Sequence, residues 1–431
     1  MKKVAFYTLG CKVNQYETEA ICELFSNNGY EICSFDDFAD VYVINTCTVT
    51  GMSDRKSRQI IRRAKKKNPK SFIIALGCYA QTKPDEVLNI DGVNLVLGTR
   101  DRDKIVELYE RYKNEKSTSC VVNISKQKDF ETLKISDYAQ RTRAYIKVQE
   151  GCNQFCTYCK IPYARGPIRS RDFDDVIAET KRLVNMGFTE ITYVGIHIAS
   201  YGLDKKAKRL SDLLIAANKI DGIKRIRLSS IEPMTLDSEF VDKIKDCDKL
   251  CHHFHLSLQS GCDETLKRMN RRYTTDEYLE IVTGLRKNFP DVSITTDVLV
   301  GFPGETDEEF KKTCDFLEKI RFSGVHIFQY SKREGTPAFS FPDQISPEIK
   351  EKRSKAVSAI ADKTKEEFMQ KFLGKTMEVL FEQRTKDGYF EGKTNNYLGV
   401  IVKTDEELSG EYKMVKLIEI HNDLIFGELI K

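Results

Sequence analysis

Three closely spaced cysteines could hold a metal cluster with one reactive position. Cys152, Cys156 and Cys159 form a Cys-x3-Cys-x2-Cys loop. Cysteine thiolates are the ligands of iron–sulfur clusters, and three of them leave one iron open, where chemistry can take place. A zinc knuckle with a distant fourth ligand is the alternative, but zinc sites usually combine two Cys/His pairs and no second pair follows nearby. The spacing therefore favours a reactive iron–sulfur cluster.

Three further cysteines lie far apart in the sequence but occupy equivalent places. Cys11, Cys47 and Cys78 each follow a predicted strand. The carboxyl ends of parallel strands share one edge of a sheet, so these thiols are expected to converge there. Gly10 and Gly77 would let the backbone approach a bulky ligand closely. The alternative is three unrelated buried thiols, because free cysteine is among the most buried residues.

The other cysteines have no ligand-like arrangement. Cys247, Cys251, His252, His253 and His255 resemble a zinc cluster, but that stretch reads as a strand whose side chains alternate between two faces. Zinc is therefore not expected there. The remaining cysteines, which have no companion at ligand spacing, are Cys22, Cys33, Cys120, Cys262 and Cys314.

The elements that would position both sets belong to an α/β chain with three domains. In the first domain, residues 1–115, strands at 4–8, 41–45 and 72–76 alternate with helical sequence, which indicates a parallel sheet. A polar, lysine-rich linker is expected at 116–137.

The central domain, residues 138–371, contains six βα units. Its strands are expected at 144–150, 189–195, 224–231, 251–258, 292–300 and 323–331. Six units fit an incomplete (βα)6 relative of the eight-fold parallel barrel, whose active site lies at the C-terminal ends of the strands. The Cys152 loop directly follows the first of these strands.

Residues 372–431 read as a small all-β barrel, a fold that often binds nucleic acid. They carry eight Lys or Arg against eleven Asp or Glu. An RNA contact would therefore need a local face of the barrel. The candidates for such a face are Arg384, Lys386, Lys393, Tyr389 and Tyr397.

The strongest signal for nucleic acid is a basic run after the Cys47 loop. Residues 55–70 hold nine basic residues and no acid. Charge runs usually mark a solvated helix face, but those mix signs, so phosphate contact is favoured here. The residues expected to contact RNA are Arg55, Lys56, Arg58, Arg62, Arg63, Lys65, Lys66 and Lys67.

Composition argues against a secreted or membrane protein. The chain is 40% hydrophobic and 31% charged, without an apolar run of membrane-spanning length. Its first residues lack the features of a signal peptide. Thirteen cysteines without a secretion signal indicate metal ligation in a reducing compartment. A cytoplasmic monomer without membrane contact is expected.

Six motifs of the sequence resemble those of a known family. They are Gly10-Cys11-Lys12-Val13-Asn14-Gln15-Tyr16-Glu17, Asn45-Thr46-Cys47-Thr48-Val49, Gly77-Cys78-Tyr79-Ala80-Gln81, Gly151-Cys152 through Arg165-Gly166, Ser257-Leu258-Gln259-Ser260-Gly261 and Gly301-Phe302-Pro303-Gly304-Glu305-Thr306. These motifs resemble those of the radical S-adenosylmethionine (SAM) methylthiotransferases over all three domains, and the C-terminal segment is similar to the family's RNA-associated TRAM domain. The first and fourth motifs are most similar to the MtaB-type branch. That branch adds a methylthio group at C2 of N6-threonylcarbamoyladenosine beside the tRNA anticodon. Gln329 departs from the branch, which often has Pro there.

The resemblance implies two [4Fe–4S] clusters and SAM as cofactors. Cys152, Cys156 and Cys159 would hold the cluster that cleaves SAM to a radical, and Cys11, Cys47 and Cys78 the one that holds the transferred sulfur. No other residue is assigned a catalytic role. Contacts to SAM are expected at the strand ends, where ordinary polarity of a barrel mouth is the alternative. They are Gly195, Glu232, Gln259, Asp297 and Gly301. Arg271 and Arg272 could meet a carboxylate or phosphate, or be a solvated helix end.

The implied partners are tRNA, an electron donor such as flavodoxin or ferredoxin, and a sulfur source. Two alternatives stay open. The same chemistry could act on isopentenyladenosine in tRNA or on a ribosomal protein. A different class is a non-catalytic iron–sulfur protein that binds RNA or transfers electrons, which would never consume SAM. No motif identifies the pocket for the amino acid on the target adenosine.

Overall fold

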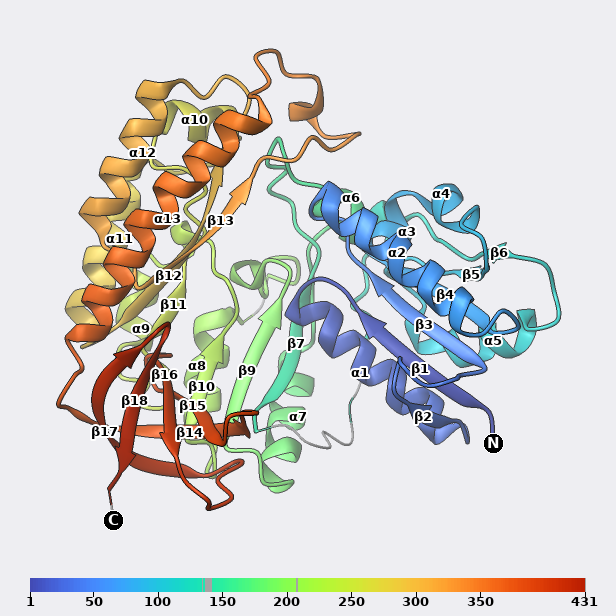
Figure 1. Ribbon diagram of the computed structural model, residues 1–431, viewed down its shortest axis with the longest axis horizontal. Coiled ribbons are helices and arrows are strands. Elements are labelled where there is room, and N and C mark those ends of the chain that lie inside the picture. Colours follow the sequence, from blue (N-terminus) through green and yellow to red (C-terminus); the bar gives the residue numbers. More distant parts are fainter. Residues whose placement is uncertain (134, 136–141, 207, 431) are drawn as a thin grey trace.

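Three domains follow one another along the chain, and each contains its own β-sheet or β-barrel (Figure 1). The computed structural model describes residues 1–133, 135, 142–206 and 208–430. The expected boundary between linker and central domain at 137/138 lies outside the described residues.

The N-terminal domain contains a six-stranded parallel sheet in the order β2-β1-β3-β4-β5-β6. Every residue of β3 and β4 is buried, as is typical of central parallel strands covered on both faces. The strands are β1 Lys3–Thr8, β2 Glu31–Cys33, β3 Val41–Thr46, β4 Phe72–Gly77, β5 Val93–Val96 and β6 Thr118–Ser119. The helices are α1 Lys12–Asn27, α2 Gly51–Lys67, α3 Cys78–Thr82, α4 Pro84–Leu88 and α5 Ile105–Tyr112. The predicted parallel sheet is confirmed, with β2, β5 and β6 added to the three expected strands.

The central domain is an open barrel of six parallel strands. Its two sheets, β10-β9-β7-β8 and β11-β12-β13, are joined by parallel bridges from Ile226 to Leu250 and from Ile231 to Leu256. The strands are β7 Ala144–Glu150, β8 Arg169–Ser170, β9 Glu190–Gly195, β10 Arg225–Leu228, β11 His253–His255, β12 Ser293–Val300 and β13 Gly324–Gln329. β8 is a short antiparallel addition to the end of β7. The expected incomplete barrel is confirmed, open between β7 and β13.

Helices cover the outside of the barrel and enclose one contiguous hydrophobic core (Figure 1). They are α7 Phe173–Asn185, α8 Leu210–Asn218, α9 Ser238–Ile244, α10 Asp263–Arg268, α11 Thr275–Asn288, α12 Asp307–Ile320 and α13 Pro347–Gln370. The short helix α6, Ile161–Arg165, instead lies against α3 of the N-terminal domain (Figure 1). α13 packs along β13 and leads directly into the last domain.

The C-terminal domain is a closed five-stranded barrel in the order β14-β15-β16-β18-β17. Its strands are β14 Thr376–Arg384, β15 Tyr389–Thr394, β16 Gly399–Lys403, β17 Tyr412–His421 and β18 Leu424–Leu429. It lies against the N-terminal ends of the central strands (Figure 1). Arg225 donates to Glu378 at 2.9 Å, and Arg143 pairs with Glu382. Part of the acidic surplus of this domain therefore docks it on the central barrel.

This docking changes the interpretation of the proposed RNA face. Tyr397 stacks on His253 with ring centroids 4.5 Å apart, so it faces the central domain. Arg384 donates to the backbone carbonyl groups of Thr404, Asp405 and Glu406 and is held within its own domain. The five candidates thus do not form one free surface.

Candidate active site

The Cys152, Cys156 and Cys159 thiols line a cavity of about 320 Å³ at the C-terminal ends of the barrel strands. Gly151 turns the chain from β7 into this loop with φ +74°, and a Cβ there would lie 1.9 Å from the carbonyl oxygen of Pro167. Only glycine fits this turn. The loop therefore begins tightly packed against the chain that follows it, which fixes where its cysteines emerge.

Three of the five expected SAM contacts line the same cavity, namely Glu232, Gln259 and Asp297. Gly195 and Gly301 are not among its lining residues. The N–H group of Gly301 donates instead to Glu305 at 2.7 Å, which fixes the turn after β12. The expected contacts thus divide into three side chains that line the cavity and two glycines that do not.

The cavity is also lined by Arg271, for which the sequence left two alternatives open, and by His197, which the sequence analysis did not single out. Arg271 is buried, donates to Glu232 at 2.8 Å and donates to the sulfur of Cys156 at 3.4 Å. Burial raises the pKa of Glu232 even though Arg271 opposes this shift. Burial and then Arg271 lower the pKa of His197 to about 4, so its imidazole is neutral near pH 7. Arg271 therefore contacts a carboxylate, and the alternative that it is a solvated helix end is wrong.

The Cys11, Cys47 and Cys78 thiols gather at the carboxyl edge of the N-terminal sheet. Burial raises the pKa of Cys78 to about 12, and the neighbouring Cys47 and Cys11 thiols raise it further against the opposing effect of Arg165. Gly10 has φ +106°, and a Cβ there would lie 3.1 Å from the Cβ of Cys47. Glycine is required here because it lets the Cys11 turn approach the Cys47 loop closely.

Each cysteine set supplies three thiols, from a single loop or from neighbouring loops. Two groups of three thiols at strand ends are the donor type and number of a four-iron cluster with an open position. The residues present therefore fit the implied clusters.

The two cysteine sets lie on adjoining walls. The chain leaves Cys47 and brings Val49 and Thr50 into the cavity beside Cys152 and its partners. From the other side, Arg165, six residues after Cys159, donates to the sulfur of Cys78 at 3.1 Å. Each domain thus reaches the cysteine set of the other.

A buried ion network joins the two domains beneath these cysteines. Glu17 is fully buried and pairs with Arg102 at 2.5 Å, Arg165 at 2.6 Å and Lys147 at 2.8 Å. Burial alone would raise the pKa of Glu17, but these three cations hold it well below its usual range. The network comprises Glu17, Glu131, Glu150, Lys147, Arg102 and Arg165. The charges of its three carboxylates and its three cations therefore cancel.

The basic run forms most of α2, whose amino end adjoins the cofactor cavity through Thr50. Three of the eight expected RNA contacts are engaged by carboxylates: Arg58 by Glu86, and Arg63 and Lys67 by Asp36. Lys65 is half-buried and donates to the carbonyl of Pro69. The exposed residues without an ion pair among the described residues are Arg55, Lys56, Arg62 and Lys66.

These four residues provide a test of the RNA surface. Changing Arg55, Lys56, Arg62 and Lys66 together to Gln should weaken tRNA binding and reduce the slope of log affinity against log salt by about 3, because fewer counterions are released. Filter binding of the full chain over a salt series measures this slope.

The matched control removes the same charge from the outer helices α11, α12 and α13, at Lys287, Lys311, Lys352 and Lys363, which are all exposed. Equal weakening of tRNA binding by both quadruple variants would contradict a specific role for α2.

Comparison with known proteins agrees with this arrangement. Residues 3–98 match the uncharacterized protein family UPF0004, residues 146–317 the radical SAM superfamily, and residues 370–430 the TRAM domain. The structure is similar to that of the radical SAM methyltransferase TsrM of Kitasatospora setae, with a TM-score of 0.58 at 15% sequence identity. The similarity covers 78% of this chain and 77% of TsrM, which shows a shared fold. The domain order and the cysteine-lined cavity thus place the chain in the class of radical SAM enzymes.

Curated relatives narrow the class. The chain is 44% identical over its full length to the threonylcarbamoyladenosine tRNA methylthiotransferase MtaB of Bacillus subtilis, covering 97% of that protein. It is 41% identical over 92% of its length to MtaB of Aquifex aeolicus, again covering 97%. It is 35% identical over 99% of its length to the tRNA-2-methylthio-N(6)-dimethylallyladenosine synthase of Methylacidiphilum infernorum, covering 94%. The chain belongs to the radical SAM methylthiotransferase family.

A membrane-spanning helix is not found: none of the helices in the described part of the chain is both long and apolar enough.

Proposed function

We propose that this protein adds a methylthio group to C2 of N6-threonylcarbamoyladenosine in tRNA, using SAM and two [4Fe–4S] clusters. The observation that carries the proposal is the pair of cysteine sets on adjoining walls, with Arg165 beside Cys78 and the Cys47 loop beside the Cys152 set. Two relatives at more than 40% identity are named for this substrate, which supports the same target here.

The two sets would have different roles. Bound by Cys152, Cys156 and Cys159, one cluster would supply the electron that cleaves SAM, and the other, on Cys11, Cys47 and Cys78, would carry the sulfur to be transferred. The buried ion network would fix the positions of the two sites relative to each other. Glu232, Gln259 and Asp297 would orient SAM by its polar groups, and Arg271 would hold Glu232 in place.

The remaining parts of the proposal concern partners and organisation. The protein would act in the cytoplasm as a monomer on tRNA, with an electron donor such as flavodoxin or ferredoxin and a separate sulfur source. Exposed cations of α2 would contact RNA phosphates. The domains would end at residues 115 and 371, with a linker over 116–137.

Mass spectrometry of tRNA nucleosides tests the target. Cells that lack the protein should lose 2-methylthio-N6-threonylcarbamoyladenosine and accumulate its unmethylthiolated precursor, and the wild-type gene should restore the product. Loss of the methylthio group from isopentenyladenosine instead would transfer the proposal to the second named substrate. An unchanged nucleoside profile would contradict a tRNA target.

A further inference from the structure

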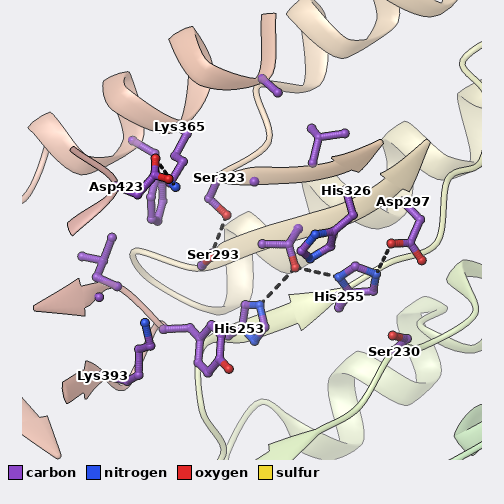
Figure 2. A pocket seen from close by; sticks show the side chains of 18 of the residues that line it. Ser230, His253, His255, Ser293, Asp297, Ser323, His326, Lys365, Lys393 and Asp423 are labelled. Carbon is purple, nitrogen blue, oxygen red and sulfur yellow. Dashed lines mark hydrogen bonds and ion pairs between the residues drawn. The ribbon is translucent and has the colours of Figure 1, made fainter. Parts of the chain in front are cut away.

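A second cavity, larger than the cofactor cavity, is lined by residues of all three domains. Figure 2 shows its walls from the central and C-terminal domains. This chamber has a volume of about 670 Å³, within the range of small-molecule sites. Its walls come from α1 through Lys12, from the interior of β11, β12 and β13, from α13, and from the C-terminal barrel through Lys393 and Tyr397. Because every domain contributes, the chamber exists only in the assembled molecule.

The chamber adjoins the cofactor cavity. Asp297 and Phe328 line both spaces. Phe328, a large aromatic residue near the C-terminal end of β13, is 41% exposed. Aromatic rings of this kind stack on unpaired bases in RNA-binding proteins. A base placed on Phe328 would lie at the boundary, with its exocyclic substituent free to enter the chamber.

The strand wall of the chamber is polar but satisfied within itself (Figure 2). His253 Nε2 and His255 Nδ1 lie 3.1 Å and 2.9 Å from Thr295 Oγ1, and His255 Nε2 lies 3.2 Å from Asp297 Oδ1. Burial, followed by the charge of Arg227, lowers the pKa of His253 well below its usual value. This wall therefore offers the neutral His253 ring and the Thr295 hydroxyl group, and it also carries the Asp297 carboxylate beside His255.

The positive charge is concentrated at the opposite wall. Lys12 is exposed to the chamber, and no ion pair of it occurs among the described residues. Lys365, in contrast, is already paired with Asp423 at 2.7 Å. Burial would raise the pKa of Tyr397, yet the cations around it, led by Lys12, lower it. Lys393 pairs with Glu391 at 3.3 Å, which leaves Lys12 as the lysine of the chamber that has no ion pair among the described residues.

We propose that this chamber receives the N6 substituent of the target adenosine and that Lys12, with Lys393 beside Tyr397, binds a carboxylate on it. This inference rests on the proposed function, which supplies the adenosine, and adds the feature that selects an acidic substituent. Lys12 directly follows Cys11, so the cation and the sulfur-carrying cysteine set share one turn of chain. A neutral, apolar substituent would leave Lys12 without a partner in the chamber.

The test measures binding rather than turnover. The probes are three anticodon stem-loop RNAs that differ only at the target position: N6-threonylcarbamoyladenosine, its neutral methyl ester, and unmodified adenosine. The full-length wild-type chain should bind the acid about tenfold or more tightly than the ester, as expected for a charge-assisted contact. Lys12→Gln should remove this preference, and Lys12→Arg should retain most of it.

The control is Lys287→Gln, an exposed lysine on α11 that should leave all three affinities unchanged. If the wild type prefers the acid but Lys12→Gln and Lys393→Gln together keep that preference, the chamber assignment is wrong and the proposed target stands. If Lys12→Gln weakens all three RNAs equally, Lys12 contacts a phosphate and the assignment is also wrong. If the wild type binds acid and unmodified RNA equally, the proposed target itself loses support.

Discussion

Replacing Glu17 with alanine is expected to lower the free energy of unfolding by about 3–5 kcal/mol, since it leaves buried cations without their carboxylate. Glu17 is fully buried and contacts Arg102, Arg165 and Lys147 directly. The midpoint of urea unfolding of the metal-free full chain, followed by far-ultraviolet circular dichroism, measures the loss. The loss of stability should be large because the buried ion pairs of Glu17 join the N-terminal domain to the central domain.

The matched control is Glu239→Ala, which removes an equal side chain from an exposed pair with Lys243 on α9. Exposed pairs contribute little, so this midpoint should move only slightly. If both variants lowered the midpoint equally, the ion network would not be what holds the N-terminal domain against the barrel.

Removing the Cys11, Cys47 and Cys78 thiols by a triple change to alanine is expected to abolish methylthiolation while leaving SAM cleavage in place. The Cys152 loop and the cavity residues Glu232 and Gln259 are untouched by this change. Release of 5′-deoxyadenosine under reducing anaerobic conditions measures cleavage, and mass spectrometry of the tRNA measures transfer.

The control for this variant changes three cysteines outside both sets, Cys33, Cys120 and Cys314, which are partly exposed. It should retain both activities. The opposite triple change at Cys152, Cys156 and Cys159 should abolish cleavage and transfer together. Continued transfer without the first set, or continued cleavage without the second, would contradict the separate roles.

Much of this site could be predicted from the sequence because both cysteine sets follow buried strands. The strand patterns place Cys47, Cys78 and Cys152 at carboxyl ends, and parallel connectivity brings such ends to one edge. The same reasoning selected Glu232, Gln259 and Asp297, which line the cofactor cavity. Local patterns were sufficient for Cys47, Cys78 and Cys152 because each follows a largely buried strand, whereas Asp297 lies within β12.

Contacts between domains could not be predicted in this way. Glu17 and Arg165 both lie within the recognised motifs, but they are 148 positions apart, and only the fold shows that they meet. Lys12 and Tyr397 similarly reach the chamber from opposite ends of the chain. Short elements were missed for a different reason: β6 has two residues and α9 has seven, too few for a clear periodicity.

The acidic character of the C-terminal domain shows why net charge was a poor guide. Its surplus of carboxylates led to the expectation that an RNA contact would need a local face, but Glu378 and Glu382 pair with Arg225 and Arg143 of the central barrel. Part of the negative charge of this domain is thus neutralised by its contacts with the central domain. The charge of its remaining exposed surface, rather than the net charge of the whole domain, decides what the domain can bind.

The central claim is that this chain holds two separate clusters, and iron content tests it most directly. Anaerobically reconstituted wild-type protein should contain about eight iron atoms per chain, and each cysteine triple variant about four. The Cys33, Cys120 and Cys314 control should match the wild type. If the wild type held about four and one triple variant lost none of them, there would be a single cluster and the two-site account would be wrong.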